Sequence, residues 1–471
     1  MRKLIALAML VMAFAAMPAL ASVQNVKVGG SIDSTWLYRE NFDLGANIIG
    51  DETQNLFITQ TMLTVDADLT DNVSTSVCLI NERAWDQKDS DAANDNDDSD
   101  VDIHLAYVTL REMLYSPLTV VVGRQAFHYG NSFIVDSSGT NNSAPTDSGI
   151  DTIAGDLTKQ TAQDAIRLIF DYEPLSLELL FSKIDSNTNA LAADDSDDVD
   201  LYGINAGYEL GDSFNTQVEA YFFAKVDKSP DGNPNDGDKS DTVYVPGLRA
   251  STKPIEGLNV QAEIAWQRGN RVATTAQTNG AANNEKREAL GAQFIANYQV
   301  PVLEEYKPVA QYVYIYVSGD SNSGDRAAST EASRNVFTGW DPMYENVSGG
   351  TIYNTLYNLS GVHVHVISLQ GNPIEDVTTK VTWTGLWLDK ELRNSTQTPF
   401  ALLQPDTTTA SVAFNAGDED LGYEIDWDTV YDYTEDVQLG ASFGWYVPGD
   451  VFTTANNDVA SQAIVHGNVT F

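Results

Sequence analysis

Histidine is the side chain most often used as a general base near neutral pH, and this sequence contains five of them. A Ser–His–acid set requires a histidine close to a nucleophile. None of the five lies in a Gly-x-Ser-x-Gly context and none adjoins a plausible nucleophile: His104, His128, His363, His365 and His466. The sequence therefore predicts no catalytic residue and no enzymatic activity. Cys78 is the single cysteine, so no intrachain disulfide can form.

Two patterns could bind a metal. In "HVHV", His363 and His365 share a face and could share an ion, but no cysteine or third histidine lies nearby. The Asp-rich stretches 89–102 and 194–200 carry oxygen donors with calcium-like spacing, yet they lack the glycine turn and trailing glutamate of a helix-loop-helix site. We predict no metal site and no cofactor, with weak Ca²⁺ binding by the acidic loops as the one alternative.

Charged residues recur within strands that are otherwise apolar on one face. In "LNVQAEIAW" (258–266) and "LGYEIDWDTVYDY" (421–433), apolar residues alternate with polar and acidic ones. A lysine or arginine in mid-bilayer hydrocarbon costs about 2–4 kcal/mol, so such charges must face a wet interior. We predict that the pore is lined by Arg124, Arg167, Lys225, Arg249, Lys380, Glu263, Glu424, Asp426 and Asp428.

Two roles are open for the inward cations. They could form a ladder of free charges that selects ions, or they could pair with neighbouring carboxylates and hold the wall rigid. Further acids are predicted on inward faces at Asp66, Asp68, Glu178 and Glu219. Because the inward acids outnumber the bases, the lining favours cations or neutral solutes over anions.

These residues need a scaffold, and runs with period-two apolarity supply it. The predicted strands lie near 26–38, 57–69, 73–84, 101–111, 118–129, 164–173, 176–184, 199–209, 215–226, 242–252, 258–268, 288–299, 308–317, 361–370, 377–388, 420–433, 437–446 and 461–471. Short turns follow the even-numbered strands and mostly long polar loops follow the odd ones. An even strand number with this alternation predicts an all-β fold, a closed antiparallel transmembrane β-barrel of about eighteen strands with periplasmic turns and extracellular loops. Loop 130–163 is long enough to fold inward and narrow the pore.

Aromatic residues on the apolar faces sort by strand end, as expected at two membrane interfaces. Tyr172, Tyr208, Tyr298 and Tyr433 lie beside short turns. Trp266, Trp387 and Trp445 lie beside long loops. Phe471 is predicted at the lipid-facing end of the closing strand, where barrel-assembly machinery reads a terminal aromatic.

The N-terminal residues 1–21 have two cations, an apolar run and Ala-Leu-Ala before Ser22, which predicts a secretory signal. Residues 22–471 are then one barrel domain in the bacterial outer membrane, reached through the periplasm. The whole chain has a net charge of −41, which disfavours nucleic acid as a partner. We expect contacts with outer-membrane lipid, lipopolysaccharide and small solutes. A monomer is expected, since no outward face is polar enough to mark a protein interface.

Three segments carry a resemblance to a known family. They are "LTVVVGRQAFHYGNSFIVD" (118–136), "FTGWDPMYEN" (337–346) and "ASFGWYVPGDVF" (441–452). They resemble a strand, a loop segment and the penultimate strand of the alginate-export family of outer-membrane porins. The resemblance implies an eighteen-stranded porin, and Arg124 lies in the first of these segments.

The predicted function is that of a passive channel for small hydrophilic solutes or ions, with a preference for cations. The family resemblance implies an alternative, export of an anionic polysaccharide such as alginate, for which a cationic lining would be expected. A third possibility is a barrel that sheathes a partner such as an electron-transfer cytochrome. The chain has no Cys-x-x-Cys-His, so any haem would belong to that partner.

Overall fold

The computed structural model describes residues 25–45, 53–85, 101–114, 117–140, 150, 154–185, 198–228, 240–272, 284–320, 336–347, 349–391 and 414–471. The predicted signal segment and most of the Asp-rich stretches lie outside these residues. Among the described residues, no helix is long and apolar enough to cross a membrane.

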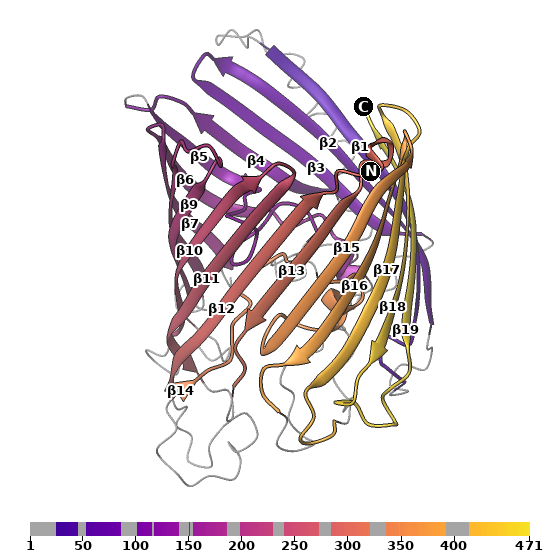
Figure 1. The fold of residues 1–471 in the computed structure, drawn as a ribbon. Helices are drawn as coiled ribbons and strands as arrows, with labels where there is room; N and C mark the ends of the chain where they lie inside the picture. Colours follow the sequence, from indigo (N-terminus) through magenta and orange to yellow (C-terminus); the bar gives the residue numbers. More distant parts are fainter. Residues whose placement is uncertain are drawn as a thin grey trace, which may run out of the picture.

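The described strands form a single antiparallel barrel that closes on itself (Figure 1). Each pairs with the next along the chain, and β19 pairs with β1. They are β1 (Asn25–Glu40), β2 (Thr53–Thr70), β3 (Val73–Ala84), β4 (Asp102–Leu110), β5 (Leu118–Gln125), β6 (Gln163–Asp171), β7 (Leu175–Asp185), β8 (Val199–Glu209), β9 (Gln217–Asp227), β10 (Asp241–Ile255), β11 (Leu258–Val272), β12 (Asn284–Gln299), β13 (Val309–Val317), β15 (Val362–Ile374), β16 (Val377–Leu388), β17 (Asp420–Asp432), β18 (Val437–Pro448) and β19 (Ala460–Thr470).

The described residues also include three short helices and one extra strand that are not members of the ring of strands. The two-residue β14 (Val336–Phe337) pairs in parallel with β12. The helices are η1 (Gly155–Leu157), η3 (Glu304–Tyr306) and α3 (Tyr353–Leu356). With β14 set aside, the predicted number of strands and their positions are confirmed.

Closure extends to the last residue of the chain. β1 and β19 pair from Ser31 opposite Thr470 to Glu40 opposite Ser461. Beyond this ladder, Gly30 donates to the carbonyl of Phe471 at 2.9 Å, and Phe471 donates to the carbonyl of Gly30 at 3.0 Å. Hydrocarbon offers no hydrogen-bonding partner, so a spanning sheet is stable only when no strand edge is left open.

The distribution of apolar and charged side chains between surface and interior is the reverse of that in a soluble protein. In β17, Tyr423, Ile425 and Trp427 are exposed, whereas Glu424 and Asp426 are buried inside. The predicted interface aromatics also lie on outward faces, most of them exposed: Tyr172, Tyr208, Tyr433, Trp387, Trp445 and Phe471, with Tyr298 and Trp266 half-buried. An apolar outer belt flanked by aromatic rings suits a bilayer.

The inner wall has two zones, defined here by the end of the barrel that they occupy. The loop end is the end with the long connections, and the turn end is the end with the short ones. On β13 and β15, the inward residues near the loop end are apolar and buried, as at Val362, Val364 and Ile315. Near the turn end of the same strands they are polar and not buried, as at Gln370 and Gln311. An apolar inner wall requires a cover, and the chain supplies it from its own loops.

Candidate functional site

Two segments enter the lumen and meet there. The first follows β5 and includes described residues 126–140, 150 and 154–162; the second runs from 336 to 361, without residue 348, and contains α3 (Figure 1). Val135 and Tyr344 form a parallel bridge between them. Asp136 donates to the Tyr344 carbonyl at 2.8 Å, and Tyr344 donates to that of Ile134 at 3.1 Å. The inward fold that the length of loop 130–163 allows is found in its described residues, and no inward fold was expected of the second segment.

The two segments share one hydrophobic core with the wall. Phe133 of the first stacks on Trp340 of the second, with ring centroids 5.5 Å apart. Both rings lie against Gly291 of β12, where no side chain keeps them from the wall. The ring of Tyr129 packs against that of Phe223 of β9, with the ring centroids 5.1 Å apart. Each buried aromatic removes a large apolar area from water, so this core holds the segments inside.

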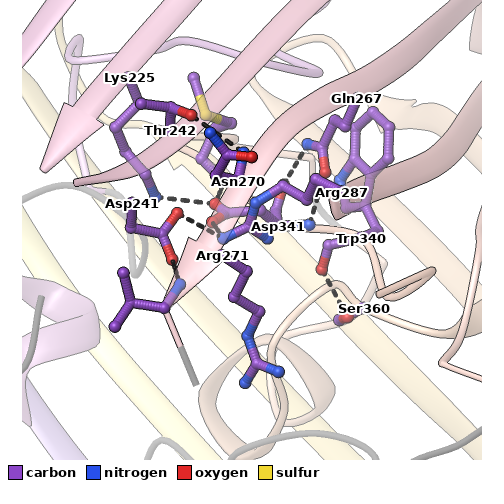
Figure 2. Close-up of polar contacts among 12 residues, drawn as sticks. Lys225, Asp241, Thr242, Gln267, Asn270, Arg271, Arg287, Trp340, Asp341 and Ser360 are labelled. Atoms are coloured by element: carbon purple, nitrogen blue, oxygen red, sulfur yellow. Dashed lines mark hydrogen bonds and ion pairs between the residues drawn. The ribbon is translucent and has the colours of Figure 1, made fainter. Parts of the chain in front are cut away.

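An ion-pair cluster fastens the second segment to the wall of β9 to β12 (Figure 2). Asp341 accepts from Lys225 Nζ at 2.8 Å and lies 3.6 Å from Arg287. Arg287 also pairs with Asp241 at 2.7 Å. Gln267 donates to the Asp341 carbonyl at 2.6 Å and accepts from the Asp341 amide at 2.8 Å. Both the side chain and the backbone of Asp341 are therefore held.

Asp341 stays ionised in this cluster. Its burial would raise the pKa, but the charges of Lys225 and Arg287 outweigh burial and hold the pKa at about 2. A carboxylate that is largely removed from water is stable at neutral pH only when it is paired in this way.

A second anchor lies on β17. The Glu424 carboxylate accepts from the backbone amides of Ile352 and Tyr353, each at 2.7 Å. These amides open α3 and have no partner within the helix, so the carboxylate satisfies both. Asp426 accepts from Thr351 Oγ1 at 2.9 Å. Two of the predicted pore-lining acids therefore hold a loop instead of facing open water.

The first segment is anchored to β1 and β3, which lie across the ring of strands from β9 to β12. Asp156 pairs with Arg39 of β1. Glu82 of β3 accepts from Thr158 Oγ1 at 2.6 Å and from the Lys159 amide at 2.8 Å. Arg39 and Glu82 are both buried, and the strand pattern alone did not single them out.

The predicted lumenal cations are mostly paired. Arg167 pairs with Glu178, and Arg249 pairs with Glu219. Both pairs join neighbouring strands, and Lys225 is engaged by Asp341. This arrangement matches the second of the two predicted roles, in which charges cross-pair and stiffen the wall.

The remaining predicted lining residues lie in the lumen with fewer contacts. Buried Glu263 accepts from Tyr221 at 2.6 Å. Lys380 and Asp428 lie opposite each other on β16 and β17, and Asp428 accepts from Ser442 at 2.7 Å. In the described ranges, the Lys380 side chain forms no hydrogen bond or ion pair, and only the backbone of Lys380 pairs with the neighbouring strands.

The predicted inward position of Arg124 is wrong. Arg124 lies on the same face of β5 as Val122, which is 41% exposed, and it pairs with Asp164 of β6 at 3.5 Å. Asp164 shares its face with the exposed Ile166. The pair lies at the loop end of the outer surface, where a paired charge reaches water and costs little.

The two closely spaced histidines also face outward. His363 and His365 alternate with the inward valines of β15, and their Nδ1 atoms lie 2.8 and 3.0 Å from the hydroxyls of Tyr314 and Tyr312. Within the described residues, no group of three or more His, Cys, Asp or Glu side chains is placed to hold a metal ion. In the described part of the Asp-rich stretch 194–200, Asp198 forms an ion pair with Lys183.

The inner cover has a signal in the sequence. In "VHVHVISLQ" the inward residues are three valines, a serine and a glutamine, so the half of β15 near the loop end is apolar within. β13 and β16 show the same change along their lengths, with Val313 and Leu386 on the apolar side. A strand that is apolar on its lumenal face predicts a covering segment, as it does for parallel strands buried on both faces.

Comparisons with known proteins agree with this architecture. A family model described as alginate export matches residues 24–466. The chain is similar in structure to OccAB1 of Acinetobacter baumannii, with 9% identity over 96% of this chain and 98% of that one and a TM-score of 0.55. The chain is also similar to the outer membrane protein OprD from Pseudomonas aeruginosa, with 10% identity over 96% of each chain and a TM-score of 0.52. A third similar structure is OccK2 (OpdF) of Pseudomonas aeruginosa, solved in complex with glucuronate. It has 11% identity over 95% of this chain and 99% of that one, with a TM-score of 0.52. No curated protein matches.

Replacing Asp341 with Asn should loosen the second segment. Removing one member of a fully buried ion pair typically costs about 3–5 kcal/mol, and a smaller destabilisation is expected here because Asp341 and Lys225 are only partly buried. We expect chymotrypsin to cleave Asp341→Asn faster than the wild type at Phe337 and Trp340 in reconstituted protein. Asp428→Asn, which holds no loop, is the matched control and should cleave at the wild-type rate. Equal rates for Asp341→Asn and the wild type would contradict the anchor.

Acid should release the same anchor only at very low pH. The pKa of Asp341 in the fold, about 2, lies below the ordinary value of about 3.9, so its stabilisation is complete above about pH 4 and is lost as the pH falls toward 2. We expect steady single-channel currents from pH 7 to about 4, with fluctuations growing below that range. If, as the pH falls from 7, the current fluctuations instead grow mainly above pH 5, another titratable group controls the docking of the second segment.

Proposed function

Since this chain belongs to the alginate export family, we propose that it is an outer-membrane channel for passive diffusion of small hydrophilic solutes and ions, with cations and neutral solutes favoured over anions. The observation that carries the proposal is the two-zone lumen. Its polar zone near the turn end is accessible to water, and its loop-end zone is narrowed by segments anchored at Asp341, Glu424 and Asp156. Such a channel fixes a path and needs no bond chemistry.

The charge of the lining supports the preference for cations. Asp66, Asp68 and Asp428 lie on inward faces near the turn end, and none forms an ion pair with another described residue. The inward arginines Arg167 and Arg249 are neutralised by partners. A passing anion therefore meets carboxylates that are not held in ion pairs, with Lys27 opposite Asp66 and Lys380 opposite Asp428 as the cations at the same levels.

Export of an anionic polysaccharide is the second candidate, and the description of the matching family model favours it. It would require Arg167 and Arg249 to leave Glu178 and Glu219 and face the polymer. A sheath for a partner protein is less compatible with this lumen, because the chain's own segments occupy and narrow the zone near the loop end. The apolar belt suits outer-membrane lipid and lipopolysaccharide as neighbours.

Lys380 and Asp428 provide a matched test, since they lie at the same level on adjacent strands. A unit charge about 8 Å from a passing ion changes its energy in water by about 0.5 kcal/mol, or about twofold in relative permeability. In single-channel recordings under a KCl gradient, the wild type should prefer K⁺. Asp428→Asn should weaken that preference and Lys380→Gln should strengthen it.

Opposite shifts from two neighbouring positions separate a charge effect from a structural one. A wild-type channel that prefers Cl⁻ and is blocked by oligouronate would reverse the ranking of the two candidates. Shifts of the same sign in both variants would reject the role of the lining charge.

A further inference from the structure

Glu424 and Asp426 of β17 lie side by side on the inner face of the wall and are both closed off from water. Glu424 is 0% exposed and Asp426 is 2% exposed. Residues two apart in a strand share a face, so the two carboxyl groups are neighbours. Gly350 of the second segment covers Glu424, since a Cβ atom there would lie 2.5 Å from the carboxyl carbon, and Gly444 of β18 leaves room for Asp426 in the same way.

One hydroxyl group joins the two carboxyls. Thr351 Oγ1 of the second segment lies 3.3 Å from Oε1 of Glu424 and 2.9 Å from Oδ1 of Asp426. A threonine hydroxyl has a single hydrogen to donate, so it cannot satisfy two ionised carboxylates at once. Glu424 also accepts from the amides of Ile352 and Tyr353, whereas Thr351 is the only donor to Asp426 within the described residues. Asp426 is therefore the acid that is less well supported in its ionised form.

No positive charge compensates this pair of acids. In the described part of the chain, no lysine, arginine or histidine forms an ion pair with either carboxyl. On β16, Lys380 lies opposite Asp428, and in the first segment Asp156 is neutralised by Arg39. The other titratable groups around the pair are acids and tyrosines, namely Asp420 and Asp428 of β17, Tyr446 of β18, and Glu345, Tyr353 and Tyr357 of the second segment. Two like charges held this close in a buried site cannot both ionise.

We propose that Glu424 and Asp426 act as a proton-dependent latch on the second segment. At neutral pH the pair holds one proton, which lies on Asp426, while Glu424 carries the charge to which the two amides donate. When that proton leaves to the solvent, two adjacent carboxylates repel each other, and water can reach them only if the second segment moves away. The latch therefore closes when the pair holds one proton and opens when both acids are ionised.

The direction of the pH effect follows from the number of protons bound in each state. In the docked state the pair binds one proton, and in the released state both carboxyls face water and bind none at neutral or alkaline pH. Docking therefore weakens as the pH rises, by up to about tenfold in its equilibrium constant for each pH unit. The Asp341 anchor has the opposite dependence, because it is lost at acid pH. The two anchors together confine docking to an intermediate range of pH.

Release of the second segment widens the loop-end zone that this segment narrows when it is docked. The effect on conductance rests on the proposed channel function, whereas the latch itself rests only on the contacts of Glu424, Asp426 and Thr351. A channel built in this way conducts less at neutral pH than in alkaline medium.

Single-channel conductance of the reconstituted protein between about pH 7 and about pH 10 tests the latch, since this range extends past the ionisation of most buried carboxyls. The wild type should show growing current fluctuations and a rise in mean conductance as the pH increases. Asp426→Asn should keep the neutral-pH conductance over the whole range, because the amide has the shape of the protonated acid and cannot ionise. A wild type without any transition, or a transition that persists in Asp426→Asn, would overturn the proposal.

Two further variants separate the latch from a general effect of negative charge. Asp428→Asn removes an acid from the same face of β17 but leaves both members of the latch, so it should retain the transition. Glu424→Gln keeps the shape of the side chain, but one amide oxygen replaces the two carboxylate oxygens that accept from Ile352 and Tyr353. It should therefore loosen the second segment at every pH. Loss of the transition in Asp428→Asn would show that the total charge of the lining controls the conductance, and would reject the latch.

Proteolysis separates a failure of the latch from a failure of the channel. Chymotrypsin cleavage at Phe337 and Trp340 is compared between the wild type and Asp426→Asn at each pH, so that the pH dependence of the protease itself cancels. The ratio of the wild-type rate to the variant rate should be about one at neutral pH and should rise by up to about tenfold for each pH unit in alkaline medium. A rising ratio in a protein that does not conduct keeps the latch and rejects the channel. A constant ratio in a conducting channel rejects the latch and keeps the channel.

Discussion

Hydrocarbon cannot hydrogen-bond a peptide group, and the rest of this structure follows from that constraint. It forces the strands into a closed ring, which the bonds between Gly30 and Phe471 complete. It also forces apolar side chains outward, so carboxylates such as Glu424 are directed inward. The lumen of such a ring is wide, and here the chain narrows one half with its own loops and leaves the wall of the other half polar.

Most of the lumenal charges described above hold the inward segments in place instead of facing a solute. Asp341, Glu424 and Asp156 each satisfy groups that would otherwise be buried without partners. The three segments that carried the family resemblance converge here, since Phe133, Trp340 and Tyr446 belong to one buried cluster. The resemblance therefore follows the packing of the lumen and does not by itself identify a solute.

Much of the barrel could be predicted from the sequence, because the period-two pattern and the alternation of loops are local signals. Arg124 failed because a strand's alternation does not show which of its faces is inward near a strand end, where a charge can reach water on either side. The anchors could not be predicted, because Lys225 and Asp341 are 116 residues apart and meet only after the second segment folds inward. The apolar lumenal faces, such as that formed by Val362 and Val364, do indicate that a segment of the chain must cover them, though not which loop does so.

Hydrogen exchange of the wild-type protein in a lipid bilayer tests the central claim, that both segments are docked inside the barrel without any solute. The amides of Ile352 and Tyr353, which donate to Glu424, and those of Asp136 and Tyr344, which join the segments, should exchange as slowly as amides in the barrel strands. Exchange of these four amides at the rate of an exposed loop would contradict the account and leave an open barrel in its place.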